Sequence, residues 1–156
     1  MKKIFLTLLA IMTMTSAVFA SSTKQEALNF FNTYVNAANN YNPAITTMYS
    51  PSARIIREVV KPDGTIVTRV TNTQRYISEM QKSQAIAKVR KYKNTYTNIK
   101  VEQTGTDTYK ISSMRQPSGE SYKLKAYSVV KKQPNGKWLI IEEMMQTKVQ
   151  MLINAK

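Results

Sequence analysis

The sequence contains no cysteine and no histidine, and only nine of its 156 residues are acidic. Ser-His-Asp and Cys-His catalysis are therefore excluded, and so is a zinc site built from the usual nitrogen and sulfur ligands. The lack of cysteine also excludes disulfides and lipid attachment through a lipobox cysteine. Because the few carboxylates are scattered, an oxygen-only cation site is not expected either. We expect no metal and no cofactor.

Basic residues are as plentiful as acidic ones are scarce. Lysine and arginine total 23, which gives a formal net charge of +14. Such an excess attracts anionic partners over long distances and makes binding sensitive to salt. The alternative is a lysine-coated surface that has no anionic partner.

The N-terminal segment has the pattern of a secretion signal. Two lysines precede an apolar run from Ile4 to Val18, and Ala20 ends a short stretch suited to signal peptidase. Hydroxyl residues interrupt the run, which is too short for a good membrane span. We predict a cleaved signal peptide over 1–20, with an uncleaved anchor as the alternative. The mature chain, 21–156, is then one domain with a charge of +12 in the periplasm or the secreted space.

Capping signals and apolar spacing predict three helices in the first part of this domain. The first begins at the capping box Thr23 to Glu26, and the second is a short helix over 44–49. A third helix starts within 71–74, where hydroxyl and amide side chains can cap it, and runs to about Ala87.

The remainder predicts strands. Pro62-Asp63-Gly64 between the runs 53–60 and 65–70 is a hairpin signal. Four longer strands follow, over 88–103, 108–115, 121–132 and 137–151. We therefore predict an α+β fold in which three N-terminal helices pack on a strongly curved antiparallel sheet of about four long strands plus a short hairpin.

Two stretches resemble the nuclear transport factor 2-like superfamily, which includes ketosteroid isomerases and polyketide cyclase-like domains. They are Ala44 to Ile55, which is similar to the family's second helix and first strand, and Asn135 to Glu143, which is similar to its last turn and strand. The resemblance covers the whole predicted mature chain. It implies a cone-shaped fold with a pocket at the wide end.

The catalytic residues of that family carry over poorly. The resemblance places Tyr34 near the isomerases' oxyanion-hole tyrosine, but Arg57 at the position of the catalytic aspartate. A guanidinium does not lose its proton in proteins and cannot act as that base. Asp63 and Asp107 both sit in predicted turns. Isomerase or cyclase activity is therefore not expected, although an enzyme with an unfamiliar site stays open.

The predicted pocket has a limited set of polar candidates. The three helices each offer a tyrosine, the first strand offers Arg57, and the last strand offers two adjacent glutamates of which only one can face the pocket. Arg57 either selects an anionic or carbonyl-bearing ligand from inside the pocket or lies on the solvent side of the hairpin. The pocket candidates are Tyr34, Tyr49, Arg57, Tyr76, Glu142 and Glu143.

The basic residues cluster in two places. One cluster is at the start of the predicted strand 88–103, and the other spans the neighbouring predicted strands 121–132 and 137–151. Tyr92 and Tyr96 beside lysines are similar to a single-strand nucleic-acid platform, but the predicted export argues against nucleic acid. The basic surface candidates are Lys88, Arg90, Lys91, Lys93, Lys123 and Lys125.

These observations predict an exported, non-catalytic binding domain. It would use a cone pocket or a basic sheet face for a small hydrophobic or anionic ligand, or for an anionic component of a bacterial envelope. The alternatives are a small enzyme of the same fold and an accessory subunit of an envelope complex. A homodimer formed through the sheet is a further candidate assembly.

Overall fold

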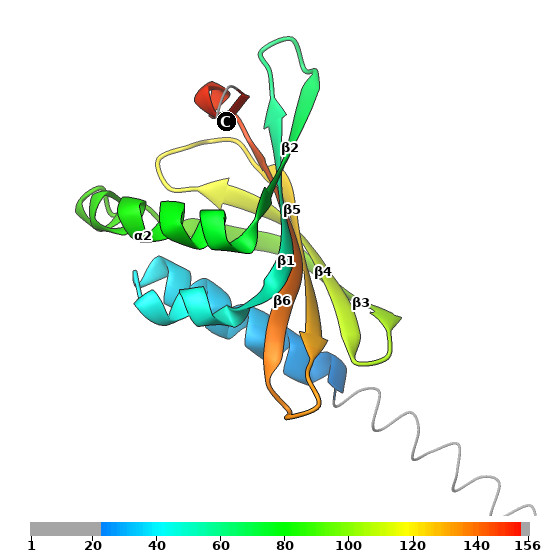
Figure 1. The fold of residues 1–156 in the computed structure, drawn as a ribbon. Helices are drawn as coiled ribbons and strands as arrows, with labels where there is room; N and C mark the ends of the chain where they lie inside the picture. The colour runs from blue at the N-terminus through cyan, green and yellow to red at the C-terminus, as the bar shows by residue number, and fades with distance from the viewer. Residues whose placement is uncertain (1–22, 154–156) are drawn as a thin grey trace, which may run out of the picture.

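The computed structural model of this chain describes residues 23–153, so the predicted signal peptide lies outside the described residues. Six strands form one sheet in the order β2-β1-β6-β5-β4-β3. Figure 1 shows this sheet curving without closing on itself. The strands are β1 (Tyr49–Val60), β2 (Ile66–Asn72), β3 (Asn94–Gly105), β4 (Thr108–Pro117), β5 (Leu124–Lys132) and β6 (Trp138–Thr147).

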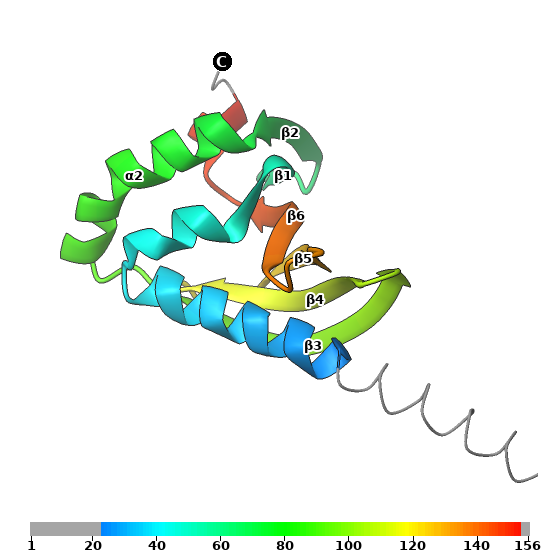
Figure 2. The same ribbon diagram turned by 60° about the horizontal axis from the view of Figure 1, so that its bottom comes forward.

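The helices gather on one side of the sheet, as Figures 1 and 2 show. Residues 23–39 are helical, and the 3₁₀ helix η1 (Pro43–Met48) leads into β1. The helix α2 (Thr73–Val89) connects β2 to β3, and a second 3₁₀ helix, η2 (Gln150–Ile153), follows β6. The predicted α+β class, with helices on a curved sheet, is confirmed.

The predicted antiparallel strands are present, but the complete sheet is mixed. Strands β3 to β6 form an antiparallel meander and β1 and β2 form the predicted hairpin, but β1 and β6 pair in parallel. The hairpin and the meander are separated in sequence by α2, so their relative direction depends on how that helix crosses the sheet. Alternation within a strand indicates which residues are buried but not the direction of a distant neighbour.

The boundary between α2 and β3 also differs from the prediction. The helix continues to Val89 and β3 begins at Asn94, so residues 88–93 are not part of a strand. Lys91 adopts a left-handed conformation (φ 52°), and its backbone N–H donates to the carbonyl of Lys88. This turn caps the C-terminal end of the helix, although the glycine that usually occupies such a position is absent.

The hydrophobic core lies between the helix 23–39 and the inner face of the sheet. Phe31 and Tyr34 from the helix pack with the inward residues of β1, β4 and β6. In β4 every second residue is buried, from Tyr109 and Ile111 onward, which is the alternation of a strand with one covered face. Tyr49, predicted to end the second helix, is instead the first residue of β1 and is also buried.

Within the described residues no helix is long and apolar enough to span a membrane. The same part of the chain contains no group of three or more acidic side chains placed to hold a metal ion.

Candidate functional site

A cavity of about 290 Å³ lies where the helices meet the inner face of the sheet. Most of the residues that line it come from the helix 23–39, from α2 and from four of the strands. The lining is largely apolar and aromatic, contains two arginines and, among the residues that the structure describes, includes no aspartate or glutamate. The polar members with long side chains are Tyr34, Tyr41, Arg57, Tyr76, Gln84, Tyr92, Tyr96 and Arg115.

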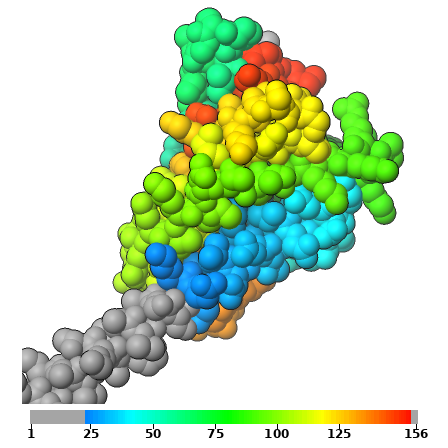
Figure 3. Space-filling view, turned by 180° about the vertical axis from the view of Figure 1, so that it is seen from behind, coloured from blue at the N-terminus to red at the C-terminus, as the bar shows by residue number. Residues whose placement is uncertain are grey.

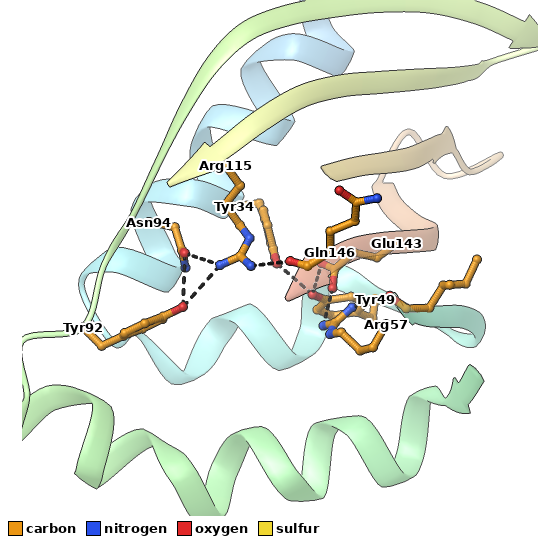
Figure 4. A network of polar contacts seen from close by, with 9 residues as sticks. Tyr34, Tyr49, Arg57, Tyr92, Asn94, Arg115, Glu143 and Gln146 are labelled. Carbon is orange, nitrogen blue, oxygen red and sulfur yellow. Dashed lines mark hydrogen bonds and ion pairs between the residues drawn. The ribbon is translucent and has the colours of Figure 1, made fainter. Parts of the chain in front are cut away.

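A buried carboxylate, Glu143, lies behind this wall and is fully enclosed, with 0% of its surface exposed. Its Oε2 accepts hydrogen bonds from the hydroxyls of Tyr34 and Tyr49, each at 2.7 Å. Its Oε1 accepts from Nη2 of Arg57, also at 2.7 Å. A buried charge is tolerated when it is paired and hydrogen-bonded in this way. Figure 4 shows the four side chains converging.

An irregularity in β6 explains why Glu143, rather than Glu142, faces inward. The pairing of β6 with β5 shifts by one residue after Ile140, so Ile141 has no direct partner. Ile140 and Glu143 consequently lie on the same side of the sheet, where strict alternation would have placed Glu142. Glu142 instead accepts from Tyr127 on the opposite face and lies 3.4 Å from Arg54.

Arg57 reaches the cavity because β1 alternates. It follows Ile55 and precedes Val59 on the inner face, and both of these residues are almost fully buried. Its side chain is 18% exposed, and its guanidinium carbon lies 4.9 Å from the ring centre of Tyr76. Burial by itself lowers the pKa of Arg57, but Tyr76 and Glu143 raise that pKa overall, so the group stays charged.

The tyrosines around Glu143 remain protonated at neutral pH. Burial raises the pKa of Tyr34 and of Tyr49 well above the ordinary value, and the nearby charge of Glu143 raises both further. Burial also raises the pKa of Tyr76, with Glu143 adding to the effect and Arg57 opposing it. These hydroxyls are hydrogen-bond donors, and those of Tyr34 and Tyr49 already donate to Glu143.

A second guanidinium, that of Arg115, lies elsewhere on the wall in a different environment. Its Nη1 donates to Oδ1 of Asn94 at 2.7 Å and to the hydroxyl of Tyr92 at 3.3 Å, and its Nη2 donates to the carbonyl oxygen of Gln146 at 2.7 Å. All these acceptors are neutral. Figure 4 shows this guanidinium between Asn94 and Gln146, apart from the Glu143 cluster. Only 5% of Arg115 is exposed.

Two buried polar atoms of cavity-lining residues lack hydrogen-bond partners within the described part of the chain. They are Nε of Arg115 and the hydroxyl oxygen of Tyr41. Arg115 also has no ion-pair partner among the described residues. A buried polar atom without a partner is uncommon and costs free energy, and a ligand can supply the missing contact.

The structure brings some of the predicted pocket residues together and separates others. Tyr34, Arg57 and Tyr76 line the cavity, while Tyr49 and Glu143 are buried behind it. Glu142 is on the other face of the sheet. Of the two alternatives for Arg57, the inward position is the one observed, and Glu143 supplies the carboxylate that offsets the cost of burying its charge.

Sequence reasoning missed Arg115, although a signal was present. Residues Tyr109, Ile111 and Ser113 alternate with half-buried residues, and the same period places Arg115 on the inner face. Extending the alternation of that strand by one step would have found it. Tyr41 had no comparable signal, because it lies in a turn with φ 55°.

The predicted basic surface divides into two regions. Lys88, Arg90, Lys91 and Lys93 occupy the end of α2 and the turn that follows it, instead of the start of a strand. Lys125 belongs to β5 and Lys123 immediately precedes this strand. All six side chains are exposed.

Comparison with known proteins is informative for structure alone. No family model matches the chain, and no curated protein resembles it in sequence. Among solved structures, a nuclear transport factor 2-like protein of unknown function from Shewanella oneidensis is 11% identical, with a TM-score of 0.59, covering 79% of this chain and 98% of that one.

Two further structures that are similar to this chain are named after enzymes. A candidate scytalone dehydratase from Novosphingobium aromaticivorans is 11% identical, with a TM-score of 0.57, over 80% of this chain and 86% of its own. A candidate ketosteroid isomerase from Shewanella frigidimarina is 19% identical, with a TM-score of 0.53, over 75% of this chain and 91% of its own. The chain therefore has the nuclear transport factor 2-like fold, as the two resembling stretches predicted.

Proposed function

We propose that this chain is a binding protein for a small amphipathic ligand that carries a carboxylate or a similar anionic group. The observation that supports this most is the buried Arg115, whose charge faces only neutral acceptors. The apolar and aromatic wall of the cavity suits the body of such a ligand. As predicted from its N-terminal segment, we place the protein in the periplasm or outside the cell.

The balance of charge supports an anionic ligand. Two guanidinium groups lie on the cavity wall, and Glu143, the carboxylate that contacts Arg57, is already paired with it. An anion at Arg115 would make charge-assisted hydrogen bonds, which are shorter and about twice as strong as neutral ones. The unpartnered Nε of Arg115 and hydroxyl of Tyr41 would then also find partners.

The same geometry favours binding over catalysis. Proton transfer requires an acid or base that a substrate can reach, but Glu143 is completely buried and held by Arg57. The hydroxyls of Tyr34 and Tyr49 are directed to Glu143, so they are not free to stabilise a developing oxyanion. The residue at the family's base position, Arg57, cannot abstract a proton.

Calorimetric titration with matched ligand pairs tests the proposal. Octanoate and phenylacetate are each compared with the corresponding methyl ester, which keeps the apolar body and removes the charge. We expect the carboxylates to bind at least about tenfold more tightly than the esters, since a hydrogen bond to a charged group contributes about 1.5–3 kcal/mol. Arg115→Met should abolish this preference.

Arg54→Met is the matched control, because it removes the same charge from an arginine that is exposed on the opposite face. Its preference for the carboxylate should remain unchanged. Equal binding of acid and ester by the unmodified protein, or a preference that survives Arg115→Met, would rule out the proposed anion site.

A further inference from the structure

Exposed apolar side chains and basic side chains occur together at one end of α2. Ile86 is 57% exposed, Val89 84% and Tyr92 41%. Four exposed basic residues, Lys88, Arg90, Lys91 and Lys93, surround them in the chain. We call residues 86–93 the α2 tip. Ile86 and Val89 are three residues apart in α2 and are therefore neighbours on the helix surface, and exposed apolar patches usually mark an interaction site.

The charge of this region has one sign only. Residues 80–101 contain six lysines and arginines and no aspartate or glutamate. No basic residue of the α2 tip forms an ion pair with any other described residue. By contrast, Arg75 in the first turns of the same helix pairs with Glu79 at 2.9 Å. The charges of the tip are therefore available to an external anion.

The shape of the molecule makes the α2 tip accessible. Figure 3 shows the green segment that contains α2 standing out from the body of the protein at one side. The turn after the helix is held by hydrogen bonds from the Lys91 and Tyr92 backbone to helix carbonyls, and by that of Lys93 with Ser118. The exposed side chains are thus presented on an ordered projection.

We propose that the α2 tip docks on the surface of an anionic lipid bilayer. Lysine and arginine would lie among the headgroups while Ile86, Val89 and Tyr92 enter the boundary with the acyl chains, which is how basic amphipathic segments bind membranes. Two aliphatic side chains at the centre of the patch fit lipid better than nucleic acid, whose binding surfaces use aromatic side chains for base stacking.

The α2 tip adjoins the cavity, since Ala87 and Tyr92 belong to both. Docking would therefore bring the cavity wall close to the lipid headgroups. The proposal does not require the cavity ligand, however, because no residue of the Arg115 site other than Tyr92 lies in the tip. Val89 lies in the tip but not on the cavity wall, so Val89→Ser should leave the preference for carboxylate over ester unchanged, and the two proposals can fail separately.

Vesicle co-sedimentation tests the docking surface, with the N-terminus of the purified protein established by mass spectrometry. We expect binding to phosphatidylglycerol–phosphatidylcholine vesicles, little binding to phosphatidylcholine alone, and a strong decrease at high salt. Lys88→Gln with Lys91→Gln should weaken binding about 25-fold, or about fivefold for each charge. Val89→Ser should weaken it up to about tenfold, because a valine is no longer buried in lipid.

Two double variants with the same change of charge serve as controls. Lys131→Gln with Lys137→Gln, at the β5–β6 end of the molecule, should stay within about twofold of the unmodified protein. Lys123→Gln with Lys125→Gln tests the other half of the predicted basic surface. A large loss in either control, or equal binding to neutral vesicles, would overturn the proposal.

The nucleic-acid alternative has its own signature. A single-stranded oligonucleotide that displaces the protein from vesicles, together with binding that Val89→Ser does not weaken, would identify the tip as a general polyanion surface. If the oligonucleotide does not displace the protein from vesicles and Val89→Ser clearly weakens vesicle binding, the bilayer is supported as the partner.

Discussion

Arg57 and Arg115 lie on the wall of one cavity but have opposite electrostatic surroundings. Arg57 is paired with the buried Glu143 and stacks near Tyr76, so its charge is balanced inside the protein. Arg115 is more deeply buried, and yet it is held by an amide oxygen, a hydroxyl and a backbone carbonyl. The same side chain type is therefore part of the internal framework at one position and a candidate receptor for an external anion at the other.

This difference shows that the location of an arginine in a pocket does not determine its role. Its role depends on how many negative charges compensate it, because a guanidinium that is already paired with a carboxylate is less available to a ligand. The variants below separate the two arginines by measuring stability, while the ligand pairs described above separate them by binding.

The largest effect is expected from Glu143→Gln. This change keeps the shape of the side chain but leaves the Arg57 guanidinium without its carboxylate, and breaking a buried pair in this way costs about 3 kcal/mol of unfolding free energy. Urea denaturation monitored by the fluorescence of Trp138 measures it. Glu142→Gln, next in the chain and on the outer face, should cost about 1 kcal/mol or less. Similar losses in both variants would contradict the framework role of Glu143.

A smaller contrast is expected between the arginines themselves. Arg57→Met leaves the Glu143 carboxylate without its charged partner and should destabilise the fold by about 3 kcal/mol. The double variant Arg57→Met with Glu143→Leu should recover much of that loss. Arg115→Met removes hydrogen bonds but also a charge with no carboxylate partner, so it should cost only about 1 kcal/mol. The order of the three denaturation midpoints is the measurement, and equal losses for the two single variants would remove the distinction.

The smallest effect is a change in alkaline stability. The pKa values of Tyr34 and Tyr49 are raised in the folded protein, so these groups contribute stability that is present below the unfolded value of about 10 and is lost as pH rises above it. The unfolding free energy should fall as pH increases from 9 to about 11. The unfolding free energy of the Tyr34→Phe variant should fall less steeply over the same pH range. Parallel curves for the two proteins would show that Tyr34 does not contribute to the decrease.

Local patterns in the sequence were sufficient for much of the fold. The turn at Gly64 joins the predicted hairpin, and Asn72 caps α2 within the predicted stretch by accepting from the Arg75 backbone. These features depend on a few neighbouring residues, so a single sequence contains all the information that they require. The same holds for the inward face of β5, where Leu124 and Ala126 are buried as alternation predicts.

Features that depend on distant partners were not accessible in this way. The sequence left Arg57 with an inward and a solvent-side position, and only the approach of β6 supplied Glu143 and so made an inward guanidinium stable. The choice between Glu142 and Glu143 depended on a bulge beside Ile141, which arises from pairing with β5.

The sequence by itself determined the charge, the absence of histidine and cysteine chemistry, the order of most elements and the inward face of β5, because these are properties of composition and short-range spacing. The tertiary structure decided the parallel pairing of β1 with β6, the carboxylate that neutralises Arg57 and the lack of one at Arg115 among the described residues. Those depend on which side chains meet across the sheet, and residues such as Arg57 and Glu143 are separated by 86 positions in the chain.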